Sequence, residues 1–325
     1  MSEKEKKQRT VRLPNVFEAL LPIVVMLGLM LYHFMAGTSY GDAHMPLLVS
    51  IVVACIIGCI CGHSFSDMMA GMLDCLNRTM EAILILCTVG ILVASFIMSG
   101  TIPALIYYGL DLLTPKLFLP VGCILCAVVG LACGSSWTTT ATIGIAFMGI
   151  GAGLGMPVAL TAGMIISGAY VGDKFSPLSD TTNLAAAVSE TGLFDHVTAM
   201  VSTTAPTFVI ALVLYTIIGF GYSTTGYDNT VALELQQALA GGYNLNPVLL
   251  LPIVVVVVVC VLKLPALPGL AISVGCGVLF GAVFQGITNV SDIFNILHYG
   301  TTFESSNELA NNLLSRGGMD HQMWT

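Results

Sequence analysis

The sequence predicts an all-α membrane protein, a multi-span helical bundle, and three observations predict it. Hydrophobic residues make up 56% of the 325 residues and charged residues only 9%, whereas a soluble domain carries about 25% charged residues. Apolar runs recur at about the 20 residues that a helix needs to cross a bilayer. Dense polar clusters interrupt these runs, which indicates broken helices or re-entrant hairpins, since non-helical backbone at membrane depth must be buried in protein or line water.

Residues 1–16 form a basic tail. Half of the ten lysines and arginines lie in the first twelve residues: Lys4, Lys6, Lys7, Arg9 and Arg12. Basic residues next to a first span stay in the cytoplasm, so we expect a multi-pass protein of the cell membrane with a cytoplasmic N-terminus. The tail runs into a full-length apolar span with no signal-peptide cleavage site. The chain has no second basic patch, which argues against a nucleic-acid partner.

Six clear candidate spans follow the tail, and three further apolar segments are broken by polar clusters. The clear spans are 17–36, 46–62, 82–100, 199–220, 247–264 and 267–285, and the broken segments are 117–134, 141–156 and 157–171. Counting crossings from the cytoplasmic tail places 63–81 inside as an amphipathic stretch and 101–116 outside. It also makes 221–246, which has no basic residue, an external loop.

The order of spans indicates an inverted repeat. Residues 17–100 read as span, loop, span, polar stretch and span, and residues from 247 onward begin the same order from the opposite side. Inverted-topology repeats are typical of secondary transporters. We therefore assign 17–220 to a first transporter repeat that contains a hairpin and a motif loop. Residues 247–325 are then the start of a second, incomplete repeat.

The first polar cluster, 133–142, reads CGSSWTTTAT. Hydroxyl side chains in a membrane helix often bond to the carbonyls of their own helix, but six of them in eight positions after a glycine favour a helix break or hairpin tip. We expect the tip to face a polar cavity. The cavity candidates are Ser135, Ser136, Thr138, Thr139 and Thr140.

The second cluster, 171–185, reads VGDKFSPLSDTTNLA. Gly172 and Pro177 both disfavour a continuous helix, and charged residues within membrane segments mark functional sites by default. Carboxylate, hydroxyl and carbonyl oxygens suit a hard cation. The candidate cation and proton ligands are Asp173, Ser176, Ser179, Asp180, Thr181, Thr182 and Asn183, with Na⁺ at Asp180 and Asn183. An ordinary cytoplasmic loop with helix caps is the alternative interpretation.

A carboxylate among such oxygens supplies a mechanism for exchange. Burial disfavours the charged form of an aspartate, and a nearby cation favours it, so Asp180 would hold either a proton or Na⁺. Exclusive occupancy of one site couples opposite fluxes if access to the site alternates. We expect Lys174 to neutralise Asp173 and to leave Asp180 free.

Three stretches resemble one known family. The segments GDKFSPLSDTTNLA, GSSWTTTATIG and SRGGMD are similar to stretches of the NhaC-type Na⁺/H⁺ antiporter family, within the ion-transporter superfamily. The resemblance implies inverted repeats with re-entrant hairpins and Na⁺/H⁺ exchange across the cytoplasmic membrane. It implies a hairpin tip at 135–140 and a cation-site loop at 173–183.

Exchange of malate and protons for lactate and sodium, which some relatives perform, is the alternative function. The hydroxyl-rich segment 133–142 would then hold a carboxylate through helix N-terminal N–H groups. The expected partners are Na⁺, H⁺ and the bilayer, with Li⁺, small carboxylates and a homodimer left open. We expect no cofactor and no enzymatic activity, because the sequence has no nucleophile–base pair, metal-ligand spacing or phosphate loop.

Overall fold

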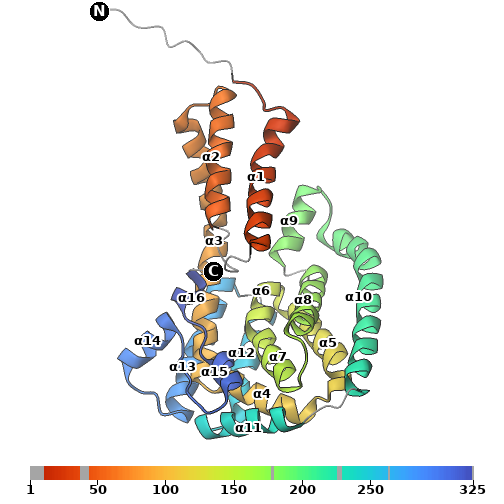
Figure 1. Cartoon of the computed structure of the whole chain (residues 1–325), viewed down its shortest axis with the longest axis vertical. Helices are drawn as coiled ribbons and strands as arrows, with labels where there is room; N and C mark the ends of the chain where they lie inside the picture. The colour runs from red at the N-terminus through yellow and green to blue at the C-terminus, as the bar shows by residue number, and fades with distance from the viewer. Residues whose placement is uncertain (1–10, 37–43, 177–178, 225–228, 263, 324–325) are drawn as a thin grey trace, which may run out of the picture. The chain divides into compact units, whose positions relative to one another are not determined.

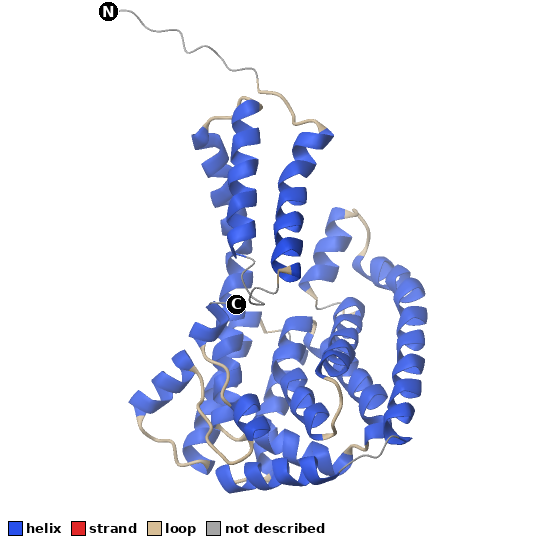
Figure 2. Ribbon diagram, in the orientation of Figure 1, coloured by secondary structure: helices blue, strands red, loops and turns tan. Residues whose placement is uncertain are grey.

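The computed structural model describes residues 11–36, 44–176, 179–224, 229–262 and 264–323. These residues form sixteen α-helices, a π-helical turn and a 3-10 turn, with no strand among them (Figures 1 and 2). The chain divides into two compact units at Ile83 and Leu84, within helix α3. The predicted all-α fold class is confirmed.

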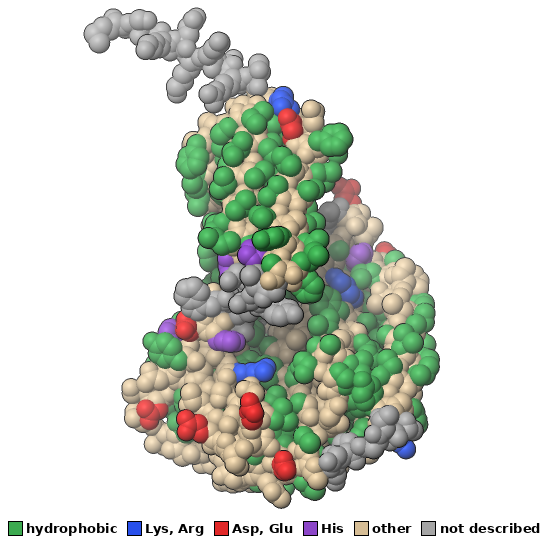
Figure 3. Space-filling model, viewed as in Figure 1, with side chains coloured by type: hydrophobic (Ala, Val, Ile, Leu, Met, Phe, Trp, Pro, Cys, Tyr) green, Lys and Arg blue, Asp and Glu red, His purple; other side chains and the backbone are tan. Residues whose placement is uncertain are grey.

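The first unit contains α1 (Val16–Met35), α2 (His44–Ile60) and the first half of α3 (Phe65–Met98). No residue of α1 is buried, and hydrophobic side chains cover the visible surface of this unit (Figure 3). Such a surface suits lipid, which is as apolar as the side chains themselves. Helices α1 and α2 pack on each other, and the Ser50 hydroxyl donates to the carbonyl of Pro22 at 2.9 Å.

Helix α3 joins two segments that the sequence analysis separates. The amphipathic stretch 63–81 and the span 82–100 form one helix of 34 residues. Its start is fixed by Ser64, whose backbone N–H and hydroxyl both donate to the Asp67 carboxylate, while the Asp67 N–H donates back to the Ser64 hydroxyl. These bonds lower the pKa of Asp67, and together they form a capping box. No proline interrupts the helix that follows.

The second unit contains the remaining helices. They are α4 (Thr101–Leu112), α5 (Pro115–Cys133), α6 (Ser136–Thr139), the π-turn η1 (Thr140–Gly144), α7 (Ile145–Gly153), α8 (Val158–Phe175), α9 (Asp180–Val188), α10 (Leu193–Thr224), α11 (Asn229–Gly242), the 3-10 turn η2 (Pro247–Leu250), α12 (Leu251–Val261), α13 (Ala266–Phe284), α14 (Val290–Tyr299), α15 (Glu308–Leu314) and α16 (Met319–Met323). Helix α5 packs against α8, α10 and α12, and Figure 1 shows it between α8 and α10.

Two segments predicted as connections are helices. Helix α4 lies in the predicted outside connection 101–116, and its Ile102, Ala104 and Ile106 are fully buried. Helix α11 lies in the predicted external loop, with Leu235 and Leu239 fully buried. The lack of basic residues in 221–246 suggests an external loop. The burial of Leu235 and Leu239 follows from their spacing, because apolar residues four apart lie on one helical face. The membrane side of both segments stays a prediction.

Among the described residues, four helices are long and apolar enough to cross a membrane: α1, α5, α10 and α13. The number rises to six if each of two bent helix pairs counts as one span. The first pair is Ile83–Met98 with Thr101–Leu112, bent by 66°, and the second is Thr230–Gly242 with Pro247–Val259, bent by 98°. Several long apolar helices and two bent pairs fit a multi-span membrane protein.

Candidate functional site

The first predicted cluster is a helix break. Helix α5 ends at Gly134, whose φ of 64° lies in the left-handed region that favours glycine. Ser135 is the N-cap of α6, and its hydroxyl accepts from the N–H of Thr138 at 3.3 Å. The chain therefore unwinds for two residues and starts a new helix at Ser136, as the sequence predicts for this cluster.

Most threonine hydroxyls of this cluster bond to their own helix. Thr139 donates to the carbonyl of Ser135 at 2.9 Å, Thr140 to that of Ser136 at 2.8 Å, and Thr142 to that of Thr138 at 2.7 Å. Such bonds often bend helices, and a π-helical turn begins here, at Thr140. Each hydroxyl oxygen keeps lone pairs after donating its hydrogen, so each can still accept or bind a cation.

Ser136 bonds across to the second cluster. Its hydroxyl donates to Oδ2 of Asp173 at 3.2 Å, and the two residues are 5% and 4% exposed. They lie 37 positions apart in the chain. A buried carboxylate is costly unless it is hydrogen-bonded, paired or bound to a cation. This contact joins the two clusters that the sequence analysis singled out.

Close packing of α5 against α8 holds Asp173 in place. A Cβ on Gly172 would overlap the carbonyl oxygen of Ala127, and one on Gly168 would overlap that of Cys123. Gly168 and Gly172 form a G-x-x-x-G pattern, which lets membrane helices approach closely. The sequence analysis missed this signal, although the pattern is visible in the sequence.

The second cluster is more helical than predicted. Helix α8 continues through Gly172, Asp173 and Lys174 to Phe175, and α9 begins at Asp180. The described non-helical residues of this cluster are therefore Ser176 and Ser179, and Gly172 stays within α8 because glycine weakens a helix by only about 1 kcal/mol. Pro177 and Leu178 lie outside the described residues.

The predicted oxygen ligands of this cluster lie close together. Ser176, Ser179 and Thr182 are fully buried. The hydroxyls of Ser179 and Thr181 are 2.9 Å apart, and the Thr182 hydroxyl lies 3.4 Å from the carbonyl oxygen of Asp173. The Asn183 amide nitrogen donates to the carbonyl of Ser179 at 2.8 Å. The contact of Thr182 with Asp173 ties the start of α9 to the end of α8.

The predicted pairing of Lys174 with Asp173 is wrong. The Lys174 ammonium donates to the hydroxyl of Thr181 at 3.3 Å, and among the described side chains the only ion pair joins Arg12 to Glu18. Lys174 and Asp173 are adjacent on a helix, and adjacent residues do not face each other. The side chain of Asp180 lies outside the described residues, so its role as the cation and proton carboxylate stays a prediction.

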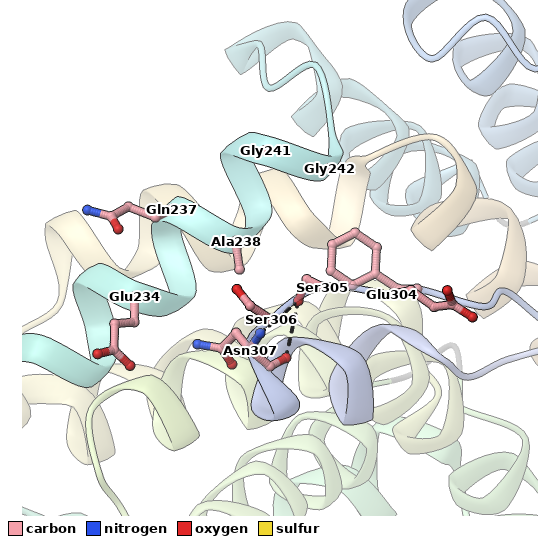
Figure 4. Close-up of a pocket in the computed structure, with 10 residues that line it drawn as sticks. Glu234, Gln237, Ala238, Gly241, Gly242, Glu304, Ser305, Ser306 and Asn307 are labelled. Atoms are coloured by element: carbon pink, nitrogen blue, oxygen red, sulfur yellow. Dashed lines mark hydrogen bonds between the residues drawn. The ribbon is translucent and has the colours of Figure 1, made fainter.

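A pocket of the described residues lies elsewhere, between α11 and the segment before α15 (Figure 4). Its volume is about 650 Å³, and two glutamates, Glu234 and Glu304, take part in its lining. Ser305 and Asn307 hydrogen-bond to each other at its floor. None of the predicted site residues lines this pocket.

Comparison with known proteins identifies relatives along the whole chain. The model of the Na⁺/H⁺ antiporter family matches residues 168–325. The malate-2H(+)/Na(+)-lactate antiporter of Bacillus subtilis is 36% identical over 96% of this chain and 66% of its own length. The arginine/ornithine antiporter ArcD of Halobacterium salinarum is 40% identical over 96% of this chain and 64% of its own. The Na(+)/H(+) antiporter NhaC of Alkalihalophilus pseudofirmus is 36% identical over 87% and 61%.

The chain thus spans slightly less than two thirds of the length of these three relatives. The comparison with solved structures found no match. The family match contains the second cluster and all helices from α9 onward. The uncharacterized Na(+)/H(+) antiporter of Haemophilus influenzae is 34% identical over 98% of this chain and 69% of its own length. Together with the family match, the apolar helices and the bent pairs, this relative shows that the chain is a multi-pass membrane protein that belongs to the Na⁺/H⁺ antiporter family.

Proposed function

We propose that the protein exchanges Na⁺ for H⁺ at a site formed by its two polar clusters. The observation that carries the proposal is the buried Asp173 carboxylate, which accepts a hydrogen bond from Ser136. A hard cation prefers such an oxygen environment. The NhaC relatives and the family model support Na⁺ and H⁺ as the exchanged ions.

The site residues keep the roles that the sequence predicts. Asp173 and Asp180 supply the carboxylates, and hydroxyl or amide oxygens complete the ligand set. These oxygens belong to Ser176, Ser179, Thr181, Thr182 and Asn183. The proposed lining of the substrate cavity is Ser135, Ser136, Thr138, Thr139 and Thr140. A carboxylate that binds either a proton or Na⁺, but not both, couples the two fluxes. Apparent Na⁺ affinity should therefore weaken as the pH falls.

The principal alternative is exchange of organic substrates, and two relatives favour it. One is named a malate-2H(+)/Na(+)-lactate antiporter and the other an arginine/ornithine antiporter. The hydroxyl cluster could serve a carboxylate as well as a cation, because each hydroxyl can donate or accept. The same fold could carry out Na⁺/H⁺, malate/lactate or arginine/ornithine exchange. The solute that proton movement requires therefore distinguishes the three functions.

Everted membrane vesicles test the proposal directly. After a proton gradient is formed, added Na⁺ should dissipate it in vesicles that carry the protein and not in vesicles from cells without it. The same measurement is then repeated with malate plus lactate and with arginine plus ornithine, each with and without Na⁺. Immunoblotting of the vesicles establishes how much protein is inserted.

Each result decides between the candidate functions. Dissipation by Na⁺ alone supports Na⁺/H⁺ exchange, and an identical response to Li⁺ would add Li⁺ to the substrates. Dissipation only with malate and lactate supports the organic-anion alternative. Arginine and ornithine exchange without proton movement would overturn both. Insertion in the cell membrane with a cytoplasmic N-terminus, and assembly as a homodimer, belong to the same proposal.

A further inference from the structure

The two bent helix pairs each contain a proline that removes a backbone donor. In the first pair, α3 ends at Met98 and α4 begins at Thr101, and Pro103 follows Ser99 by four positions. In the second, α11 ends at Gly242, and Pro247 follows Asn244 by three positions. The carbonyls of Ser99 and Asn244 both lie just before a helix start, outside the helical hydrogen bonds that begin at the N-caps Gly100 and Asn246.

Gln285, the C-cap of α13, bonds to both breaks. Its side-chain nitrogen Nε2 donates to the carbonyl of Ser99 at 3.2 Å and to that of Asn244 at 3.3 Å. Its oxygen Oε1 accepts from the backbone N–H of Asn244 at 3.0 Å. One carboxamide thus donates to a carbonyl at each break and also accepts from an N–H at the second break.

The first break is shaped to admit this carboxamide. Gly100 has a φ of 82°, and a Cβ on it would lie 2.5 Å from Nε2 of Gln285. Any other residue there would be strained in the backbone and would also displace the amide. Ser99 and Thr101 on either side are fully buried, with hydroxyls 2.7 Å apart. A cavity of about 270 Å³, lined in part by Met98, Tyr243 and Thr301, borders Gln285.

We propose that Gln285 is a positioning residue that couples the two bent pairs, so that they change conformation together. This inference rests on the proposed transport function. Alternating access in transporters with broken helices moves groups of helices around the binding site. Because the Gln285 side chain bonds to both breaks, a movement of one bent pair would move the other. The adjoining cavity gives the carboxamide room to follow such a movement.

Two substitutions of Gln285 test its side-chain donor and its side-chain acceptor separately. Gln285→Leu removes all three side-chain hydrogen bonds and keeps a side chain of similar size. Gln285→Glu keeps an acceptor for the Asn244 N–H but loses both donors. Gln237→Leu is the matched control, because Gln237 is an exposed glutamine on α11. All three variants are measured in everted vesicles with the amount of inserted protein determined in each.

For Gln285→Leu we expect the maximal rate of Na⁺-dependent proton movement per inserted protein to fall by about tenfold, the effect of a lost hydrogen bond or two. The Na⁺ concentration for half-maximal response should stay unchanged, because Gln285 lies outside the proposed cation site. The maximal rate of Gln285→Glu should lie between those of Gln285→Leu and wild type. Gln237→Leu should have the wild-type rate. An unchanged maximal rate in Gln285→Leu, or a loss explained entirely by reduced insertion, would overturn the inference.

Hydrogen exchange provides a readout that does not depend on transport. In purified protein, the amide of Asn244 should exchange several-fold to about tenfold faster in Gln285→Leu than in wild type, and should stay protected in Gln285→Glu. Wild-type protein that shows no Na⁺ response would refute the proposed function while this measurement still tests the link. Equal protection in wild type and Gln285→Leu would refute the link itself. If Gln285→Leu does not insert, the rate and exchange of Gln285→Glu decide.

Discussion

Asp173 is the residue whose chemistry depends most on its surroundings. It is 4% exposed, and it accepts a hydrogen bond from Ser136 on a different helix. Its neighbour Lys174 donates to Thr181 instead of neutralising it. We propose it as a carboxylate of the exchange site, because a buried carboxylate needs a hydrogen bond, a paired charge or a bound cation.

We expect Asp173→Asn to lower Na⁺-dependent proton movement by about 100-fold or more, because a neutral amide cannot release a proton and would leave the proposed Na⁺ without its charge partner, a loss of about 3–5 kcal/mol. The vesicle assay measures it, and Asp292→Asn, an exposed aspartate in the first turn of α14, is the control. Asp180→Asn should give the same loss if both carboxylates belong to the site. Full activity of Asp173→Asn, with normal insertion, would remove Asp173 from the site.

The sequence predicts the members of the site better than their contacts. Asp173 and Ser136 both belong to the candidate set, because charged and hydroxyl residues are conspicuous in an apolar chain. Their contact depends on how closely α5 approaches α8, which follows from glycines that are far apart in the sequence. The role of Gln285 is harder to predict from the sequence, because it is a single polar residue at the end of an apolar helix. Its hydrogen bonds depend on how the end of α13 packs against the two helix breaks.

At the scale of helices, the contact between α5 and α8 positions the site. Three glycines on these helices, Gly130, Gly168 and Gly172, face backbone atoms of the partner helix. A side chain at any of them would have to push two backbones apart, and a backbone yields less readily than the end of a flexible side chain. The distance between the helices, and with it the Ser136–Asp173 contact, is therefore set by these positions.

Gly172→Ala should destabilise the protein by about 1–3 kcal/mol, the usual cost of overpacking, and should also weaken transport, because it displaces Asp173. Thermal unfolding of the purified protein measures the stability. Gly275→Ala is the matched control: Gly275 is a helical glycine, and a Cβ added to it would meet nothing within 4 Å. That change should be neutral or stabilising by up to about 1 kcal/mol. Equal melting temperatures for the two variants would contradict the close contact.

Helices α4 and α11 show why elements between spans are hard to predict. Both are short, and both begin or end near a proline or glycine, which in sequence suggests a connection. Their burial comes from tertiary partners: the side-chain nitrogen of Gln236 on α11 donates to the carbonyl of Tyr107 at 3.1 Å and to the Asp111 carboxylate at 2.9 Å on α4. Helix α4 is the second half of one bent pair and α11 is the first half of the other. In each pair the sequence predicts the other half as a span, 82–100 or 247–264, and treats this half as a connection.

For the whole molecule, the number of crossings decides which face each element meets. The clear candidate spans 17–36 and 267–285 coincide closely with α1 and α13. The segment 82–100 instead forms only part of a bent pair. The orientation of the later helices depends on whether each bent pair crosses the membrane once or twice. A chain with ten basic residues offers too few charges to decide this from the sequence.

Labelling of single cysteines tests the predicted orientation. With the native cysteines replaced, Ser64→Cys should react with a membrane-impermeant maleimide only in everted vesicles, because 63–81 is predicted to be cytoplasmic. Gln237→Cys, exposed beside the pocket of Figure 4, should react only in right-side-out vesicles, since basic residues mark cytoplasmic loops and 221–246 has none. Reaction of both cysteines from one side would show that an odd number of crossings between them is wrong. The bent pairs would then have to be re-counted, and if both cysteines react in everted vesicles, the pocket of Figure 4 opens to the cytoplasm.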